Sequence, residues 1–239
     1  MSLFSIFTNC NNYDMENKCA LCELKSAATR KLSPAELDKL SANCLTVRFK
    51  KGDSIIKEGT FSTNVAYLKE GLVKIHIEGP HRTQLLRIVK PASYLALPTT
   101  FGDKINHYSV TAIEESVVCF IDVTLFRKLL ISNPQFTNQI LVELCKGELD
   151  SYYNCVNRTQ KQIRGKLAEL LLDFADNIYN SGEFVISLNQ EDIGNLIDAS
   201  RESVSRTMSE FARDNIIELK GKSVKILDKS RLNYINKSG

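Results

Sequence analysis

The stretch that decides the fold is Gln190-Glu-Asp-Ile-Gly-Asn-Leu-Ile-Asp-Ala-Ser-Arg-Glu-Ser-Val-Ser-Arg206. Its apolar residues recur at helical spacings that direct them toward one small core, and they are Ile193, Ile197 and Val204. Asn189 and Ser200 belong to the residue types that cap helix N-termini, which predicts where two short helices begin. The stretch therefore predicts two short helices that meet at a tight turn.

The turn between these helices carries two further signals. Gly194 has no side chain, so the second helix can approach the first closely. Asp198 occupies the turn, where glycine is commoner, and Asp tolerates a left-handed backbone better than most residues. The pattern is typical of a helix-turn-helix, whose second helix, here about residues 200–214, lies in the major groove of DNA. The alternative is an ordinary helical hairpin inside a larger core.

Composition limits the class of protein. The chain has 239 residues, a formal net charge of +3 and seven cysteines. No apolar run approaches the ~20 residues needed to span a bilayer, and no secretory signal is visible at the N-terminus. We therefore expect a cytoplasmic protein with no membrane partner, in a reducing compartment where thiols stay free or bind metal. The net charge alone is too small to indicate a nucleic-acid partner.

The N-terminal half contains a cysteine-containing segment, a helix start and then a region of short apolar runs. Residues 1–30 form a cysteine-containing segment with little periodicity, and Ser33-Pro34-Ala-Glu36 is a helix start. From about Leu45 to Ile121, short apolar runs alternate with turn residues. This pattern predicts an antiparallel β-barrel of the β-roll or jelly-roll kind within a domain at residues 31–133, to which the family resemblance described below assigns effector sensing.

A long helix is predicted at residues 134–158. One of its faces carries an apolar stripe at three- and four-residue steps, made of Leu141, Cys145, Leu149, Tyr152 and Val156. Such a helix must bury its apolar surface against something. We expect one face to lie on the β-domain and the stripe to bind a second subunit; the alternative is a core helix within one chain.

Residues 159–239 read as a DNA-binding domain of the winged type. An amphipathic helix over Gln162–Tyr179 and a strand at Phe184–Ser187 precede the helix-turn-helix. A hairpin of Ile216–Leu219 and Val224–Leu227 follows it, with a basic turn at Lys220-Gly-Lys222 that suits phosphate contact. The predicted fold is α+β: an N-terminal antiparallel barrel, a long dimerisation helix and a C-terminal winged helix-turn-helix.

This order of elements resembles the Crp/Fnr family of bacterial transcription regulators over about residues 19–235. The most specific matches are Lys51-Gly-Asp-Ser-Ile-Ile-Lys-Glu-Gly59, the long helix continuing into Gln160–Leu172, and the Asp192–Arg206 stretch. The resemblance implies a homodimer formed through the long helix, with the barrel controlling DNA binding. The expected partners are double-stranded DNA with a palindromic operator, a second copy of the chain and RNA polymerase.

The resemblance also implies which side chains read DNA. Glu202 and Arg206 match an acid and an arginine of the family, and their spacing of four puts both on one helical face. Arg donates two bonds to guanine and Glu accepts one from cytosine. Arg201 matches the cyclic-AMP receptor branch and Ser205 the oxygen-sensing branch, so the half-site is expected to be a variant of TGTGA/TTGAT. The full set of expected DNA-binding residues is Arg201, Glu202, Ser203, Ser205, Arg206 and, in the wing, Lys222. The alternatives are helix-dipole compensation by Glu202 and a surface salt bridge between Glu202 and Arg206.

Cyclic AMP is not expected to be the effector. Barrels of the family hold its phosphate with a Gly-Glu pair and, about ten residues later, an Arg-Ser pair. Here the first position reads Pro91-Ala-Ser-Tyr-Leu95 and the second falls near Asn106-His107. A cyclic phosphate would lack its charge partner. Either aromatic residues fill the space or another ligand occupies it, and the aromatic residues are Tyr94, Phe101 and Tyr108.

The cysteines suggest a different signal and place the chain nearer the Fnr-type branch. Cys119 matches the position of that branch's fourth cluster ligand, and the chain also has Cys19-Ala-Leu-Cys22 and Cys10. The resemblance implies a [4Fe–4S] cluster held by Cys10, Cys19, Cys22 and Cys119, which oxygen would dismantle, changing how the dimer helices pack. One departure is that the branch usually places its third N-terminal cysteine after the CxxC pair. A zinc site, a Cys19–Cys22 disulfide and thiols without a role stay open.

The same residues give weaker support to other classes of protein. Haem would need a histidine ligand, and His76 alternates with apolar neighbours while His81 and His107 lie in expected turns. A dithiol oxidoreductase at Cys19 and Cys22 would need a strand before the motif and a helix at it, and neither is evident. A sensor or scaffold with a decayed DNA-binding half is disfavoured by Glu202 and Arg206. We therefore expect a regulator and not an enzyme.

Overall fold

The computed structural model describes residue 22 and residues 24–239. The helices are η3 (Thr29–Lys31, a 3-10 turn), α1 (Pro34–Ala42), α2 (Leu97–Phe101), α3 (Val123–Ser132), α4 (Pro134–Gln160), α5 (Ile163–Asp173), η4 (Phe174–Ile178, a π-helix), α6 (Gln190–Ile197), α7 (Arg201–Arg213) and α8 (Lys229–Ser238). The strands are β1 (Cys44–Phe49), β2 (Ser54–Ile56), β3 (Asn64–Glu70), β4 (Val73–Glu78), β5 (Thr83–Val89), β6 (Ser93–Tyr94), β7 (Ser109–Ala112), β8 (Ser116–Asp122), β9 (Glu183–Val185), β10 (Ile217–Lys220) and β11 (Ser223–Ile226). None of the helices in this described part of the chain is long and apolar enough to cross a membrane.

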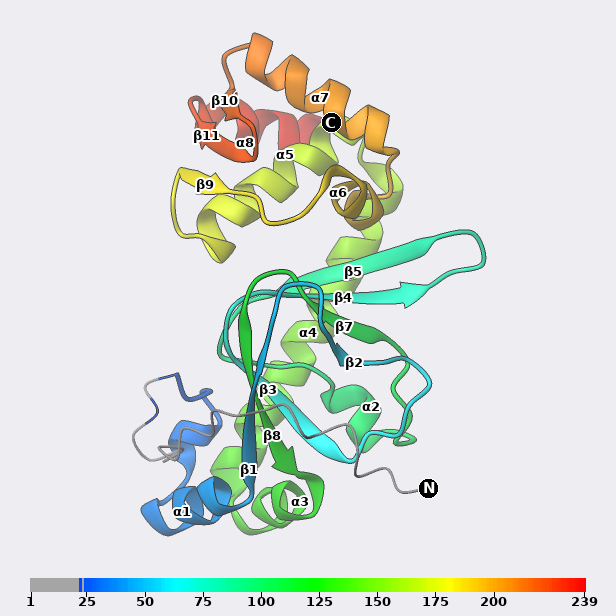
Figure 1. Ribbon diagram of the computed structural model, residues 1–239. Helices are drawn as coiled ribbons and strands as arrows, with labels where there is room; N and C mark the ends of the chain where they lie inside the picture. Colours follow the sequence, from blue (N-terminus) through cyan, green and yellow to red (C-terminus); the bar gives the residue numbers. More distant parts are fainter. Residues whose placement is uncertain (1–21, 23) are drawn as a thin grey trace.

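The N-terminal strands form two four-stranded antiparallel sheets, in the orders β1-β8-β3-β6 and β2-β7-β4-β5 (Figure 1). Alternate residues of each strand point between the sheets because successive side chains of a strand point to opposite faces. The apolar core between the sheets comprises Ala66, Leu68, Val73, Ile75, Val89, Leu95, Val110 and Val118. The barrel predicted from the short alternating strands is therefore confirmed.

Helices cover the outer face of the first sheet. Ser33 and Glu36 form a capping box at the start of α1, as the sequence predicted. Phe126 of α3 and Phe136 of α4 are fully buried against this sheet, with ring centroids 5.2 Å apart. This second apolar cluster joins the start of the long helix to the barrel.

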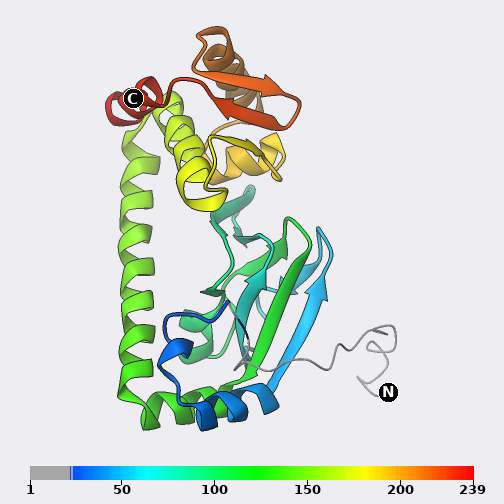
Figure 2. The same ribbon diagram turned by 90° about the vertical axis from the view of Figure 1, so that its left-hand side faces the viewer.

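The helix α4 runs alongside the barrel up to the C-terminal domain (Figure 2). Its 27 residues make it about 40 Å long. It begins where Asn133 caps it and Pro134 takes the first position, as Pro does where a backbone N–H has no helical partner. Only Phe136 and Ile140 of this helix are buried, so most of its surface beyond the barrel is open.

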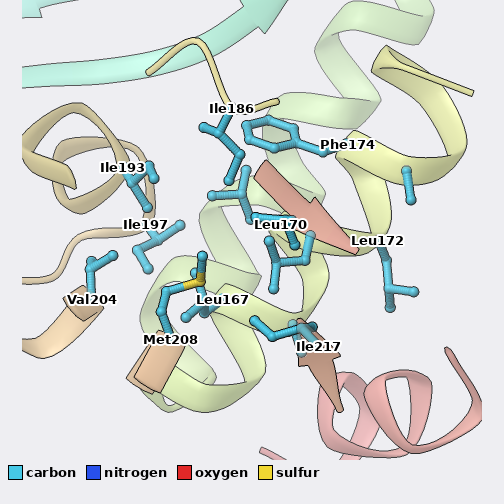
Figure 3. Packing of buried hydrophobic residues seen from close by; sticks show 14 of the residues in the cluster. Leu167, Leu170, Leu172, Phe174, Ile186, Ile193, Ile197, Val204, Met208 and Ile217 are labelled. Carbon is cyan, nitrogen blue, oxygen red and sulfur yellow. The ribbon is translucent and has the colours of Figure 1, made fainter. Parts of the chain in front are cut away.

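The C-terminal elements pack around one apolar core (Figure 3). Leu167 and Leu171 of α5 are fully buried at its centre. The sheet β10-β11-β9 closes one side, and α8 packs on α5. The predicted winged helix-turn-helix, and with it the α+β fold, is confirmed.

Several element boundaries differ from the sequence prediction: α4 ends two residues later, at Gln160, and the wing strands are shifted by one residue. The helix expected to continue to Tyr179 leaves the α conformation after Asp173 and passes into the π-helix η4, in which the backbone N–H of Tyr179 donates to the carbonyl of Phe174 at 2.8 Å. The strand expected over 184–187 is β9, which begins one residue earlier and ends two residues earlier because its pairing with β11 runs from Glu183 to Val185. Hydrophobic periodicity does not distinguish these alternatives, since both keep the same apolar residues inward.

Candidate DNA-binding interface

The helix-turn-helix has the caps and turn that its sequence predicts. The Asn189 side-chain oxygen accepts from the Asp192 backbone N–H at 2.7 Å, and the Ser200 hydroxyl accepts from the Ser203 N–H at 3.2 Å. Asp198 takes the left-handed conformation, with φ 58° and ψ 57°. The chain thus turns from α6 into α7 over three residues.

The two helices are held together by a small apolar core and a close backbone approach. Ile193, Ile197 and Val204 are all buried and belong to the C-terminal core. A Cβ atom at Gly194 would lie 2.6 Å from the carbonyl oxygen of Ala199. No side chain fits there, which is why this position takes glycine.

The opposite face of α7 is polar and open to solvent. Arg201, Glu202 and Arg206 are exposed. Within residues 24–239, no side chain forms an ion pair or hydrogen bond with Glu202 or Arg206, and the two do not pair with each other. Their donors and acceptors are therefore available to a partner.

A shallow hollow follows this face of α7. It is lined by Gln190, Arg201, Glu202, Ser205, Arg206 and Ser209. Gln190 and Ser209 were not predicted from the sequence; Gln190 enters because the first position of α6 abuts the first turn of α7. Ser203 was predicted to face DNA but does not line the hollow, and its hydroxyl accepts a bond from Ser200 at 3.1 Å.

The wing continues the same surface. A second hollow extends from Arg201 to Gly221 and Lys222 at the tip of the β10–β11 hairpin. Gly221 adopts a φ of +63°, which this tight turn requires. Lys220 is held by Glu218 at 2.6 Å, and this contact raises the pKa of Lys220. Lys222 is exposed and forms no ion pair with any described residue, so the wing presents one uncompensated cation.

The comparisons with known proteins agree with this geometry. Residues 46–133 match the family described as cyclic nucleotide-binding domain, and residues 165–235 match the Crp-like helix-turn-helix domain. The CRP-like cAMP-activated global transcriptional regulator of Mycobacterium tuberculosis is 28% identical over 206 residues, covering 84% of this chain and 92% of that protein. Transcriptional activator protein FnrA of Stutzerimonas stutzeri is 25% identical over 186 residues, covering 75% of each.

Solved structures show the same fold. FixK2 from Bradyrhizobium japonicum superimposes with a TM-score of 0.76 at 16% identity, over 82% of this chain and 98% of that one. The chain belongs to the Crp/Fnr family. It is a Crp/Fnr-type DNA-binding transcription regulator, and the family relatives found are transcription regulators as well.

In this Crp/Fnr regulator, the long helix carries the apolar stripe on an open face. Leu141, Leu149, Tyr152 and Val156 are 54%, 53%, 58% and 49% exposed, and Cys145 is exposed too. Val142, at 37%, joins them. From Val142 the steps to Cys145, Leu149, Tyr152 and Val156 alternate between three and four residues, which is the heptad spacing of a coiled-coil seam.

The predicted cluster ligands are described only in part. Cys10 and Cys19 lie outside the described residues. Cys119 on β8 stands between Thr46 on β1, whose hydroxyl is 3.4 Å from the thiol, and Tyr67 on β3. Tyr67 donates to the carbonyl of Leu24 at 2.7 Å, two residues after Cys22.

Both described thiols lie near the Tyr67 hydroxyl. Burial raises the pKa of Tyr67 well above its usual value, and Tyr94, Cys22, Glu143 and Cys119 raise it further. Cys22 and Cys119, distant in sequence, thus both act on the same Tyr67 hydroxyl. These half-buried thiols are soft donors of the kind that iron–sulfur clusters and zinc require.

The segments that would hold a cyclic phosphate have their polar groups engaged. Asn106 is buried, accepting from Thr99 at 3.2 Å and donating to Thr60 at 3.1 Å. His107 is paired with Asp103 at 2.7 Å on the surface.

The three aromatic residues expected to fill that space do not all lie within it. Tyr94 and Phe101 pack against Phe126 on the outer face of the first sheet. Only Tyr108 packs on the core between the sheets, donating to the carbonyl of Leu95 at 3.0 Å. The expectation was wrong for Tyr94, because alternate strand positions face opposite sides of the sheet, and for Phe101, because it ends the short helix α2 and packs on Phe126.

Proposed function

We propose that the protein is a homodimer that reads a palindromic operator with two copies of α7. The observation that carries this proposal is that Glu202 and Arg206 both line the hollow of α7, are exposed, and are bonded neither to each other nor to another described side chain. Arg206 donates two bonds to a guanine, and Glu202 accepts from a cytosine amino group. Arg201 and Ser205 extend this contact along the groove, and Lys222 binds phosphate from the wing.

The experiment that tests base reading compares cognate with random DNA. Arg206→Ala should weaken binding to the selected operator by about 1–3 kcal/mol per half-site and relax the preference at one base pair. Dimerisation should be unchanged because Arg206 lies far along the chain from α4. An equal loss of affinity on random DNA would show that Arg206 only touches phosphate.

The dimer is proposed to form through the seam from Val142 to Val156. A two-fold axis through parallel helices places identical seam residues opposite one another, so Cys145 would face its symmetry mate. Mild oxidation with diamide should therefore cross-link two chains through Cys145. Cys145→Ser should abolish the cross-link, while Cys155→Ser, exposed but beside the seam, should retain it. A cross-link that depends on Cys155 alone would contradict this seam.

The signal is proposed to be redox chemistry at thiols, with Cys10, Cys19, Cys22 and Cys119 holding a [4Fe–4S] cluster. What supports it is the resemblance to the Fnr branch together with the convergence of Cys22 and Cys119 beside Tyr67. A bound cluster would supply an oxygen-labile redox centre there. Tyr67 and Thr46 orient Cys119 from the neighbouring strands, and the bond from Tyr67 to Leu24 keeps Cys22 close.

An anaerobic preparation tests this signal. The protein should be brown, with visible absorbance that bleaches in air and is lost in Cys119→Ser but kept in Cys155→Ser. Zinc without iron would identify a different thiolate metal site, and a preparation with neither metal would overturn metal sensing altogether. In that case the barrel would sense a small ligand or haem.

Cyclic AMP is proposed not to be the effector, in contrast to the mycobacterial relative whose name records cAMP activation. The support is the absence of an acid and an arginine from Pro91–Leu95 and Asn106–His107. Titration calorimetry with cyclic AMP should show no saturable heat. As a DNA-bound regulator without enzymatic activity, the protein would act in the cytoplasm together with RNA polymerase.

A further inference from the structure

The β4–β5 hairpin of the barrel reaches the side of the helix-turn-helix away from the reading face (Figure 1). Lys74 on β4 donates to the Asp192 carboxylate of α6 at 2.5 Å. Arg82 in the hairpin loop pairs with Asp198, and Gln84 on β5 donates to the carbonyl of Asn195. The hairpin supplies the cations and the helix-turn-helix supplies the acids. We call these three interactions the hairpin contact.

The two ion pairs differ in exposure. The side chains of Lys74 and Asp192 are 22% and 17% exposed, whereas those of Arg82 and Asp198 are 48% and 49% exposed. The Lys74–Asp192 pair is therefore less screened by salt. The position of the Arg82 pair matters more than its strength, because Asp198 is the left-handed residue at which α6 turns into α7.

The base of the hairpin is anchored to the long helix. Arg158, near the end of α4, donates to the carbonyls of Leu85 at 3.1 Å and Leu86 at 2.7 Å. Two barrel residues, Leu72 and Ile113, are buried in the core of the C-terminal domain. The hairpin contact thus surrounds an apolar junction and is tied to the helix that carries the dimer seam.

The covalent connection between the two parts is short, and its residue Lys161 also bonds Glu169 of α5 and Asn236 of α8. Only Lys161 and Gln162 separate α4 from α5, and both are extended. Extended residues between helices allow rotation about their backbone bonds. The orientation of the DNA-binding domain therefore depends on non-covalent contacts, and the hairpin contact touches the helix-turn-helix itself.

The hairpin contact leaves the reading face open. None of its acceptor residues on the helix-turn-helix, Asp192, Asn195 and Asp198, lines the hollow of α7. The contact can therefore persist while α7 occupies a major groove. The hairpin contact binds the helix-turn-helix on the side away from the reading face, at the turn that sets the direction of α7.

We infer that Lys74 and Arg82 are positioning residues for operator recognition: acting through Asp192 and Asp198, they set the distance and angle between the two α7 helices of the dimer. The inference rests on the proposed dimeric function. Half-sites of a palindrome lie one helical turn apart, so a dimer with rigidly placed helices should discriminate sharply between operator spacings.

The test is a series of operators in which one or two base pairs are added or removed between the half-sites. Each base pair moves the half-sites by about 3.4 Å. The double variant Lys74→Ala/Arg82→Ala should bind the native spacing roughly three- to tenfold more weakly, as expected for two partly exposed pairs in each protomer. It should lose less on the altered spacings, so that its spacing profile flattens. Arg48→Ala, which removes a barrel ion pair with Glu115 that includes no residue of the helix-turn-helix, is the matched control and should keep the wild-type profile.

A double-mutant cycle separates the ion pair from the backbone turn. Asp198→Asn keeps a residue that tolerates the left-handed conformation but removes the charge. If Arg82 acts through Asp198, then Arg82→Ala and Asp198→Asn should together cost little more than either alone. Thermal unfolding and sedimentation would verify that each variant is a folded dimer.

The inference and the proposed function fail in different ways. A dimeric, folded double variant with the wild-type spacing profile, or with tighter binding to the native spacing, would overturn the inference while leaving the proposed function intact. A wild-type protein that sediments as a monomer or ignores operator spacing would contradict the two-fold reading itself, and the inference with it.

Discussion

Two helices of this molecule expose a long face, and the faces are opposite in chemistry. On α7 the apolar residues Val204, Met208 and Phe211 are buried, and the exposed side is charged. On α4 it is the apolar side that is exposed, with Leu149 and Tyr152 more than half accessible. Both faces lack a partner within the part of the chain that the structure describes.

The difference teaches what kind of partner each face requires. Water hydrates a charged face, so exposing it costs little free energy. A partner that replaces this water must therefore offer matching hydrogen-bond groups, as base edges and phosphates do. An exposed apolar stripe costs about 25 cal/mol for each Å² left in water, so its partner must be another apolar surface. DNA suits α7 and a second protein helix suits α4.

The sharpest way to break this comparison is to put a charge into the apolar stripe. Leu149→Asp should convert the dimer into a monomer because two carboxylates would meet at the seam. Binding to the palindrome should fall by about 100-fold or more, since a monomer loses the gain from engaging two half-sites together. Sedimentation and operator titration measure the two effects. Ser151→Asp adds the same charge off the stripe and should leave both unchanged.

Within the charged surface, the two lysines of the wing, Lys222 and Lys220, can be compared directly. Lys222→Ala should weaken binding several-fold on all sequences and reduce the slope of log affinity against log salt by about 0.9 for each phosphate that is no longer neutralised. Lys220→Ala should have a smaller effect because Glu218 already compensates Lys220. Titrations at four salt concentrations would test this, and equal effects of both lysines would contradict the assignment of Lys222 as the free cation.

The turn between α6 and α7 contains Asp198 in the left-handed conformation and leads into the helix with the charged face. Asp198→Ala should lower the free energy of unfolding by roughly 1–2 kcal/mol, because alanine resists the left-handed backbone. Asp198→Gly should unfold at nearly the wild-type temperature because glycine adopts that backbone freely. Calorimetry gives both values, and similar losses for the two variants would point to the carboxylate and not the backbone as the source.

The smallest expected effect concerns pH. Burial, aided by Lys74, lowers the pKa of His76 below 6.5, while Glu78, Asp192 and Glu58 act in the opposite direction. The unfolded chain then binds more protons than the folded one, so stability from this residue is present above pH 6.5 and declines as pH falls through that value.

His76→Gln should flatten the dependence of unfolding free energy on pH between about 7.5 and 5. The His76 ring contacts the Thr111 hydroxyl at 2.9 Å, and glutamine can replace that bond. Denaturant unfolding at several pH values measures the slope. An unchanged slope would show that other groups dominate the titration.

Local geometry was largely predictable from the sequence. Asn189, Ser200 and Asp198 define caps and a turn through their own side chains and backbone preferences, which act within a few residues. Ile193, Ile197 and Val204 identify the motif core because helical periodicity alone brings them together. The same reasoning could not locate the end of α5, since α- and π-helical continuations bury the same residues.

The sequence by itself determined the order of elements, the caps and the helix-turn-helix, because each depends on short-range spacing and intrinsic backbone preference, and the family resemblance pointed to the charged pair on α7. Tertiary structure alone decided that Gln190 lines the reading surface, that Lys220 is compensated while Lys222 is not, that Tyr67 bonds the carbonyl of Leu24, and that Asp198 is held by Arg82. These are contacts between residues brought together by the fold of the whole chain. No local pattern carries them, since the partners lie on different elements whose separation depends on every element packed between them.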